Sequence, residues 1–541
     1  MTRLTSSAAG LRLRWCVVAV SFFAMCALWA VATPAMSSPD EPSHTIKAVA
    51  VARGELSGTV GPRPTSWMVP GALTTVHVPA DYAVVPGLNC YSTLPEQPAS
   101  CMPGLPDDHT TIVEANTAAG HYPPLYYALV GWPSRLLPAD PGILAMRLVS
   151  AAVSSAFVVA GLVALRATRA SRIVRWGAVT ALTPMALFLF ATINPNGLEI
   201  SAGFAAWASS WALFGARGRV PRHVLAIAAV SFAVLANVRG LSPLWALVIV
   251  TLTLLGSGRT RALWGERRRL VLGAFAYVAV VSVPSVLWSV RYGTLLTGEG
   301  LWPAYEDKVV AVTDMVLSLS KQYQQMIGNL GWFDSPVPLL TLLVWTVSLG
   351  MLAALALQRR GQVSAKVALG VLFVGVVVGP MLVQLPGVAD AGLVWQGRYT
   401  LPIAIGLPLL AAWILAPGAE REEPTAARLS RGMIATLGFA GALAFYGAAR
   451  RYAVGAGGPY ATTEPAWSSN LGFMPAVVLY VIALVVFLVA LDGGRDPRGP
   501  EDAGRDAGHD AGRDAGHDAG ADAPRIGAIA HSDDSQTDAR S

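Results

Sequence analysis

Two carboxylates and an imidazole lie close together after the first apolar stretch of the chain, in Asp40-Glu41-Pro42-Ser43-His44. A carboxylate held there could accept a proton from a hydroxyl as a general base. Nearby apolar surface would raise its pKa, and an arginine would lower it. The alternative role is helix capping, since a polar residue here could be the N-cap of a helix over about 41–52. The two roles are compatible, and the candidate catalytic residues are Asp40, Glu41 and His44.

Arginines beside apolar stretches form the second group of candidates. Arg239 interrupts one stretch, Arg291 follows another, and Arg398 begins a third in Gln396-Gly397-Arg398-Tyr399. The planar guanidinium suits phosphate because it donates paired, charge-assisted hydrogen bonds. The alternative for these arginines is a structural salt bridge with an acidic residue. The candidate partners are Asp40, Glu41, Glu199 and Asp334.

Aromatic side chains accompany these polar groups. Tyr122 begins Tyr122-Pro123-Pro124-Leu125-Tyr126-Tyr127, and Trp332 lies in Gly331-Trp332-Phe333-Asp334. Such rings could stack on a sugar or anchor the protein at a membrane interface. The candidate substrate-binding residues are Tyr122, Arg239, Arg291, Trp332, Asp334, Gln396, Arg398 and Tyr399. The sequence has no zinc-ligand spacing, Walker loop or serine triad, so no cofactor is predicted; a divalent metal could bind, but nothing indicates one.

The elements that must position these residues are membrane helices. Hydrophobic residues make up 54% of the 541 residues, and charged residues only 13%. The apolar residues come in runs of about 20, the length at which a helix crosses the hydrocarbon core. The sequence therefore predicts an all-α polytopic membrane protein with about 12 transmembrane helices. The expected spans are 14–33, 142–165, 173–192, 197–215, 221–237, 240–257, 269–289, 336–357, 366–386, 399–416, 432–448 and 472–491.

Clusters of basic residues give the orientation of these spans. They precede the first span and follow the second, fourth, sixth, eighth and tenth, so all lie on one side. By the positive-inside rule this side is the cytoplasm, where we place both termini of a multi-pass cell-membrane protein. The first apolar stretch is longer than a usual signal-peptide core, which favours an uncleaved helix.

The predicted spans divide the chain into three parts. Residues 1–13 form a cytoplasmic N-terminus, 14–491 the membrane domain, and 492–541 a disordered, low-complexity cytoplasmic tail rich in Gly, Asp and Ala. Within the membrane domain, 34–141 form a large first extracytoplasmic loop with surface helices. Tyr122 to Leu137 is one such helix or a short re-entrant piece, because counting it as a span would place the next basic cluster outside the cytoplasm. The candidate residues all fall on the outer face.

Two of the four cysteines, Cys90 and Cys101, lie in the first outer loop. That compartment is oxidising, so we expect these two residues to form a disulfide. By the loop-entropy relation the bond would stabilise the loop by about 2–3 kcal/mol. Cys16 and Cys26 lie in the first span, where cysteine behaves as a small apolar residue.

Taken in order, the motifs around Asp40, Tyr122, Asn194, Trp332 and Arg398 resemble those of a bacterial, often actinobacterial, family of predicted membrane proteins classed as a domain of unknown function. The resemblance covers about residues 15–490. That family is similar in layout to GT-C type membrane glycosyltransferases.

The resemblance implies transfer of a sugar from a polyprenyl-phosphate donor to a cell-envelope glycan, lipid or protein acceptor on the outer face. It implies that Asp40, together with Glu41, occupies the catalytic acid position, and that Arg239 or Arg398 binds phosphate. Asn196 departs from the pattern, because an acid is expected there in many relatives.

Other functions remain open at this point. A transporter or lipid flippase would need polar residues along a path near the membrane midplane, and the sequence has few. A non-catalytic protein of envelope assembly is a further alternative. Membrane lipids are expected partners and nucleic acid is not, since orientation in the membrane explains the basic residues.

Overall fold

The computed structural model describes residues 8–60, 74–168, 171–215, 219–294, 304–416 and 423–493. The chain divides into two compact units, and residues 12–492 form the larger one, which is described here. The other unit contains residues 1–11 and 493–541. The predicted disordered tail therefore lies almost entirely outside the described residues.

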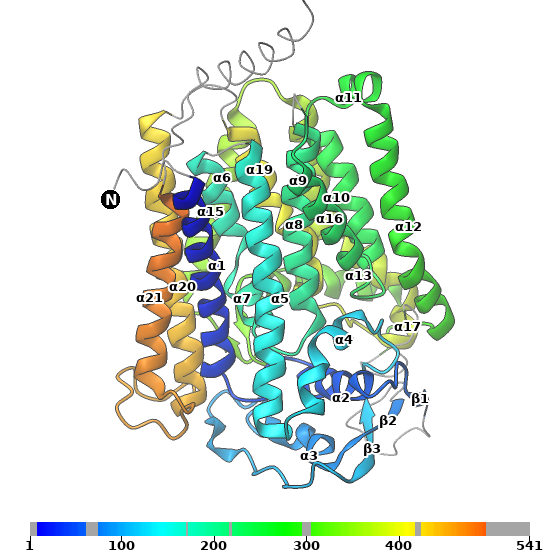
Figure 1. The fold of residues 1–541 in the computed structure, drawn as a ribbon, viewed down its shortest axis with the longest axis vertical. Helices are drawn as coiled ribbons and strands as arrows, with labels where there is room; N and C mark the ends of the chain where they lie inside the picture. Colours follow the sequence, from blue (N-terminus) through cyan, green and yellow to red (C-terminus); the bar gives the residue numbers. More distant parts are fainter. Residues whose placement is uncertain are drawn as a thin grey trace, which may run out of the picture. The chain divides into compact units, whose positions relative to one another are not determined.

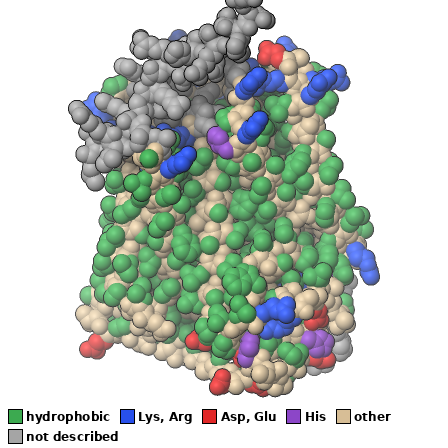
Figure 2. All heavy atoms as spheres, viewed as in Figure 1, with side chains coloured by type: hydrophobic (Ala, Val, Ile, Leu, Met, Phe, Trp, Pro, Cys, Tyr) green, Lys and Arg blue, Asp and Glu red, His purple; other side chains and the backbone are tan. Residues whose placement is uncertain are grey.

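Helices, most of them apolar, make up most of the larger unit, and the long ones run side by side (Figure 1). They are α1 (Ala8–Ala32), α5 (Ala139–Thr168), α6 (Arg172–Ala181), α7 (Pro184–Phe190), α8 (Pro195–Gly215), α9 (Arg222–Leu235), α10 (Ser242–Gly256), α11 (Thr260–Glu266), α12 (Arg268–Tyr292), α15 (Leu339–Gln358), α16 (Val363–Gln384), α18 (Gly397–Ala404), α19 (Gly406–Leu415), α20 (Pro424–Val454) and α21 (Phe473–Asp492). Hydrophobic side chains cover the middle of the face in Figure 2, and charged side chains gather toward its two ends.

The number of spans is smaller than predicted when it is judged by helix length and composition. Among the described residues, 8 helices are long and apolar enough to cross a membrane. The number rises to 10 if α6 with α7 and α10 with α11, bent by 65° and 98°, each count as one span. The other two predicted spans are α8, in which all but one of the 21 residues are buried, and the 14-residue α9. Helix α8 is enclosed by protein, and α9 is apolar but shorter than a full span, so about 12 spans stays a prediction.

The segment between α1 and α5 contains more than the surface helices that the sequence predicted. It forms α2 (Glu41–Ala52), α3 (Ala80–Ala83) and α4 (Leu125–Gly131), and also a three-stranded antiparallel sheet of β1 (Thr59–Val60), β2 (Thr74–Pro79) and β3 (Ile112–Thr117) in that order. In β2 every second side chain is buried, including Val76 and Val78, the alternation of a half-buried strand. The strands are too short to stand out in a Pro- and Gly-rich sequence.

Helix α2, which begins one residue after Asp40, packs against α4 and against the sheet (Figure 1). Its buried residues include Ile46, Ala48 and Val49, which form a second apolar core with β2 and α4. The packing against α4 and against the sheet thereby fixes the position of α2.

A second irregular region follows α12. It contains α13 (Lys308–Leu317), α14 (Leu319–Ile327) and a two-stranded ladder of β4 (Asn329–Leu330) and β5 (Ser335–Pro336). The ladder closes the turn from Gly331 to Asp334, in which Gly331 and Phe333 have left-handed backbone conformations with φ 63°. A short helix, α17 (Val388–Ala391), precedes α18.

We predict that Gly131→Ala destabilises the protein, because a Cβ at Gly131 would lie 2.1 Å from the carbonyl oxygen of Ala48 in α2. Overpacking of this kind costs about 1–3 kcal/mol. Thermal unfolding of the purified protein in detergent measures the change. Gly87→Ala, where the new methyl group meets nothing within 4 Å, is the control. Equal melting temperatures for both variants would contradict the close α2–α4 contact.

Candidate functional site

Asp40 and Arg398, 358 residues apart in the sequence, meet in the structure as an ion pair. Asp40 occupies the N-cap position of α2, but its side chain makes no capping hydrogen bond and its backbone is left-handed, with φ 63°. Its carboxylate instead accepts a hydrogen bond from Nη2 of Arg398. The Asp40 side chain is 47% exposed, whereas that of Arg398 is 1% exposed. The capping alternative is therefore wrong for Asp40, whose carboxylate faces a buried cation on one side and remains accessible on the other.

Arg398 uses only part of its hydrogen-bonding capacity. Its Nη2 donates to Asp40 and, at 3.2 Å, to the hydroxyl of Tyr399. Its Nε and Nη1 are buried and have no hydrogen-bond partner among the residues that the structure describes. A buried donor without a partner is costly and rare, most of all when it carries charge. Arg398 is therefore a cation with two nitrogens available to a ligand.

Aromatic rings and guanidinium groups alternate around this pair. The Tyr399 ring lies between two arginines, 4.4 Å from Cζ of Arg239 and 5.1 Å from Cζ of Arg398. On the outer sides, Tyr122 lies 5.8 Å from Arg239 and Phe333 lies 5.5 Å from Arg398. Cation–π contacts of this kind stabilise like charges that would otherwise repel each other. They bring Tyr122, Arg239, Arg398 and Tyr399, four of the predicted residues, into one cluster.

Arg239 has a structural partner in addition to these rings. Its Nη1 lies 2.6 Å from Oδ1 of Asn196 and 3.4 Å from Oε2 of Glu199, and Ser242 Oγ donates to the other oxygen of Glu199 at 2.7 Å. The salt-bridge alternative considered from the sequence thus holds for Arg239 with Glu199. Asn196, the departure from the expected acid, accepts the shorter of the two hydrogen bonds. Arg398 is the less occupied of the two arginines.

The charges around Asp40 favour its ionised form. Desolvation by the surrounding protein raises the pKa of the Asp40 carboxyl, but the charge of Arg398, assisted by that of Arg239, outweighs this effect and holds the pKa below its usual value. Burial lowers the pKa of His44 to about 3, so this imidazole is neutral near pH 7. Its Nδ1 lies 2.9 Å from the hydroxyl of Tyr127, which fixes the ring one helical turn beyond Asp40.

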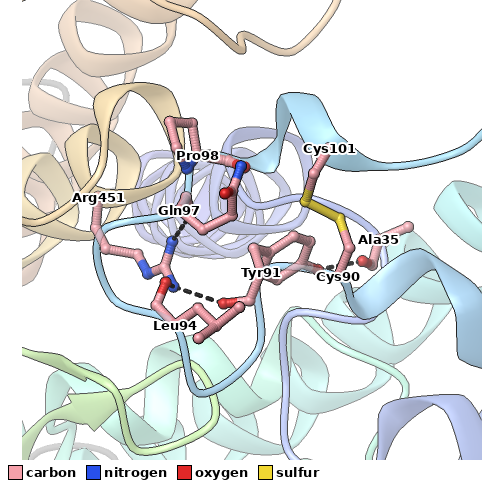
Figure 3. The surroundings of a disulfide bond; sticks show 8 residues. All are labelled: Ala35, Cys90, Tyr91, Leu94, Gln97, Pro98, Cys101 and Arg451. Carbon is pink, nitrogen blue, oxygen red and sulfur yellow. Dashed lines mark hydrogen bonds between the residues drawn. A yellow bond between two sulfur atoms is a disulfide. The ribbon is translucent and has the colours of Figure 1, made fainter.

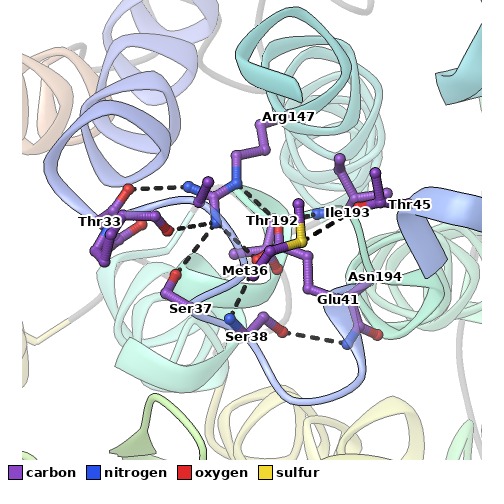
Figure 4. Close-up of polar contacts among 12 residues, drawn as sticks. Thr33, Met36, Ser37, Ser38, Glu41, Thr45, Arg147, Thr192, Ile193 and Asn194 are labelled. Carbon is purple, nitrogen blue, oxygen red and sulfur yellow. Dashed lines mark hydrogen bonds and ion pairs between the residues drawn. The ribbon is translucent and has the colours of Figure 1, made fainter. Parts of the chain in front are cut away.

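Glu41, predicted as a second catalytic carboxylate, lies in a buried network of polar contacts (Figure 4). It is 0% exposed and bonds Arg147 in α5 through both oxygens, each at 2.7 Å. The backbone N–H groups of Ser38 and Ile193 donate to the same carboxylate at 3.2 and 3.0 Å. Both oxygens of Glu41 are thus bonded and its surface is fully enclosed, and its role as a second catalytic carboxylate stays a prediction. The sequence did offer a signal for its partner, because Arg147 is an isolated charge inside an apolar run.

Arg147 also holds the α1–α2 linker, residues 33–40, which leads to Asp40. It donates to the carbonyl oxygens of Thr33 and Pro34 at 2.9 and 2.8 Å and to Ser37 Oγ at 3.3 Å (Figure 4). From the opposite side, Asn194 Nδ2 donates to the carbonyl oxygen of Pro39 at 3.0 Å. The linker has no regular secondary structure, and these side chains satisfy its backbone instead.

The turn from Gly331 to Asp334 contacts the same linker. Nε1 of Trp332 donates to the carbonyl oxygen of Met36 at 3.0 Å, and Asp334 pairs with Arg451 at the end of α20 at 3.1 Å. Trp332, predicted to bind substrate, thus contacts the linker, and Asp334, predicted likewise, bonds the backbone N–H of Trp332 within the turn at 3.2 Å. The sequence did not single out Arg451.

The remaining predicted residues are divided between the site and the surface. Gln396 is the N-cap of α18, and its Oε1 is buried with no hydrogen-bond partner among the described residues. Arg291 is exposed at the end of α12, with its guanidinium over the ring of Tyr292. Cys90 and Cys101 form the expected disulfide, with a Cα–Cα distance of 6.1 Å (Figure 3).

The described residues contain no group of three or more His, Cys, Asp or Glu side chains that could hold a metal ion.

Comparison with known families agrees with the motifs. Residues 23–407 match the family described as predicted membrane protein (DUF2142). The chain belongs to the DUF2142 family. This confirms the family expected from the sequence and identifies the chain as a multi-pass membrane protein. No curated protein matches this DUF2142 chain.

Two solved structures of ArnT from Cupriavidus metallidurans align with the DUF2142 chain at 15% sequence identity. The structure bound to undecaprenyl phosphate gives a TM-score of 0.41 and covers 93% of this chain and 79% of ArnT. The apo structure gives a TM-score of 0.43 and covers 92% and 79%. A likeness of this size does not establish a shared fold or activity.

We predict that Glu41→Gln and Arg147→Met each destabilise this DUF2142 protein strongly, because each leaves one buried charge without its partner. The expected cost is about 3–5 kcal/mol for either single change and less than their sum for the double variant. Thermal unfolding in detergent measures it, with Arg291→Met as the exposed control. Melting temperatures like the control's would show that the pair does not stabilise the linker.

Proposed function

We propose that this DUF2142 protein is a membrane glycosyltransferase that moves a sugar from a polyprenyl-phosphate donor to a hydroxyl of a cell-envelope glycan, lipid or protein. The observation that supports this function best is the pairing of a buried, partly unoccupied arginine with an accessible carboxylate. Arg398 binds the donor phosphate, and Asp40 accepts the proton of the acceptor hydroxyl.

Arg398 is suited to a phosphate because of its surroundings. Its Nε and Nη1 are the buried donors without partners, and a phosphate oxygen is the acceptor that satisfies a guanidinium best. Burial keeps water from screening the charge, so an anion bound there interacts more strongly than it would at the surface. Tyr399 and Phe333 hold the guanidinium from two sides, which fixes the position of the phosphate.

The proposed transfer uses the side chains of Asp40 and Arg398 as follows. The acceptor oxygen attacks the anomeric carbon of the sugar, and the bond from that carbon to the phosphate oxygen breaks. The acceptor proton goes to the carboxylate of Asp40, and the polyprenyl phosphate leaves with the bonding electron pair. Arg398 stabilises the negative charge that grows on the phosphate.

The Asp40–Arg398 ion pair couples donor binding to the strength of the base. In the free protein Arg398 holds the pKa of Asp40 below its usual value, which favours the ionised form but makes the carboxylate a weak base. A bound phosphate takes up part of the charge of Arg398, so the pKa of Asp40 rises. Asp40 therefore becomes a stronger base when the donor is in place.

The other site residues belong to the same proposal. We assign Tyr122, Tyr399 and Gln396 to the donor site, with the unpartnered Oε1 of Gln396 accepting a hydrogen bond from a sugar hydroxyl. His44, neutral and bonded to Tyr127, orients the start of α2 rather than transferring a proton. Asn196 and Glu199 hold Arg239 in place.

The proposal includes the arrangement in the membrane. Basic clusters on one side of the predicted spans support cytoplasmic termini, with Asp40 on the outer face of the cell membrane. About 12 spans and a large first outer loop are the GT-C layout. The weak likeness to ArnT adds no support to this function.

We predict that Asp40→Asn abolishes transfer but leaves binding of a polyprenyl phosphate intact, whereas Arg398→Gln weakens binding by at least tenfold, about 1.4 kcal/mol. The assay follows a labelled sugar from a polyprenyl-phosphate donor into lipid, glycan or protein fractions in membranes that contain the full chain. Asp390→Asn and Arg291→Gln, which change exposed residues elsewhere, are the controls. Transfer by Asp40→Asn at the wild-type rate would exclude Asp40 as the base. Donor-dependent flux in sealed vesicles without covalent transfer would favour a flippase instead.

The pKa shifts predict a specific pH dependence. A base with a lowered pKa is ionised above that pKa and loses activity only as the pH falls through it, so kcat/KM for the donor should not decline between pH 7 and pH 5 on account of Asp40. His44, with a pKa of about 3, should add no inflection near 6.5. Since the donor raises the pKa of Asp40, the acid limb of kcat should lie at higher pH than that of kcat/KM. Coincident limbs would show that donor binding does not affect Asp40.

A further inference from the structure

We infer that Arg451 is a positioning residue that links the disulfide-closed loop, residues 90–101, to Asp40. The inference about geometry stands on its own contacts, and its catalytic consequence rests on the function proposed above. Reduction of the Cys90–Cys101 bond should therefore displace Asp40, although both cysteines lie outside the Asp40–Arg398 cluster.

Arg451 gathers the disulfide-closed loop onto the end of α20. The side chain is 4% exposed, and its Nη1 and Nη2 donate to backbone carbonyls of the loop (Figure 3). The three acceptors are the carbonyl oxygens of Gln97 at 2.7 Å, Tyr91 at 2.8 Å and Leu94 at 2.9 Å. One guanidinium thus orders a loop that has almost no regular secondary structure. By closing the loop, the disulfide keeps the three carbonyls within hydrogen-bonding distance of Arg451.

The same guanidinium binds the Gly331–Asp334 turn. Its Nη2 pairs with Asp334 at 3.1 Å, and its Nε donates to Ser335 Oγ at 3.0 Å. Phe333 in this turn lies against Arg398. Arg451 therefore contacts both the disulfide-closed loop and the turn that supports the buried arginine of the site.

Both elements then bind the α1–α2 linker at adjacent residues. The hydroxyl of Tyr91, next to Cys90, donates to the carbonyl oxygen of Ala35, and Trp332 of the turn donates to that of Met36 at 3.0 Å. Tyr91 is fully buried and packs edge-on against Tyr452, the residue after Arg451, with a ring distance of 5.4 Å. The path from the disulfide to the linker consists of packed, hydrogen-bonded groups.

The backbone of this region needs such support. Met36, Asp40 and Phe333 have left-handed backbones with φ of 64°, 63° and 63°. Residues other than glycine rarely adopt this conformation. Strained residues of this kind persist only where the surroundings hold them. When the disulfide of the loop is reduced, or the guanidinium of Arg451 is replaced, we expect the linker to relax. The carboxylate of Asp40 should then move.

The expected effect is on turnover rather than on donor binding. The backbone of Arg398 belongs to α18 and its guanidinium keeps the contact with Tyr399, so donor binding should change less than turnover. A shift of the base by about 1 Å can cost 10- to 100-fold in rate. Arg451→Lys and Cys90→Ser with Cys101→Ser should each lower kcat by about tenfold or more, with KM for the donor changed by less than about threefold.

Hydrogen exchange on the full chain in lipid nanodiscs tests the geometry without any substrate. Reduction of the disulfide, the double serine variant and Arg451→Lys should each speed exchange in peptides that cover residues 33–44, with little change in β2 and β3. Arg450→Lys is the matched control. Arg450 also binds backbone carbonyls, those of Ala456, Gly458 and Pro459, but none in the disulfide-closed loop.

Combining the changes separates coupling from general weakening. If the disulfide acts through Arg451, reduction of the Arg451→Lys variant should add little to its exchange rate or to its loss of kcat, whereas independent effects would add. A melting curve for each variant verifies that the protein is folded under the conditions of the exchange and activity measurements. Unchanged exchange over 33–44 after reduction, or fully additive effects, would overturn the inference. Failure of sugar transfer in the wild type would overturn only the proposed function, because the exchange measurement does not depend on it.

Discussion

The buried ion pair between Glu41 and Arg147 is the interaction on which the rest of the site depends. A carboxylate and a guanidinium taken out of water are stable only when nearly every oxygen and N–H group has a partner. Here the partners are the carbonyls and amides of the α1–α2 linker and of the chain before α8. The hydrogen bonds that the linker makes to this ion pair thus fix the linker. The linker in turn positions Asp40 at the start of α2.

Two adjacent acids, and three arginines far apart in the sequence, differ in how fully they are bonded because their surroundings differ. Glu41 is fully enclosed with both oxygens occupied, while Asp40, the preceding residue, is 47% exposed with one cationic partner. Arg147 and Arg451 are occupied by backbone carbonyls, while Arg398 keeps two nitrogens without partners. The proposed chemistry requires a group that is held in place but not fully bonded, and of these five residues Asp40 and Arg398 meet both conditions. The alternation of Tyr122, Arg239, Tyr399, Arg398 and Phe333 keeps the two cations close without an acid between them.

Several features could be predicted because they depend on local composition or on the compartment. The helical, multi-pass character follows from apolar run length, and the pairing of Cys90 with Cys101 follows from the presence of two cysteines in one expected outer loop. The motifs also indicated the family, and Asp40 and Arg398 were among the residues that they marked. The three-stranded sheet escaped prediction because its strands are short. The predicted number of spans exceeds the 8 to 10 described helices that pass by length and composition, because a helix such as α8, enclosed by protein, does not need the hydropathy of one that faces lipid.

The sequence by itself determined which residue types lie at the ends of the apolar helices, since the membrane sorts charged from apolar residues whatever the packing. The tertiary structure alone decided which of those residues became partners. Glu41 and Arg147 are 106 residues apart and Asp40 and Arg398 are 358 apart, and no local pattern indicates which pair is fully bonded. Burial and the number of free donors decide whether an arginine supports the backbone or can receive a phosphate, and both arise only when distant helices pack together.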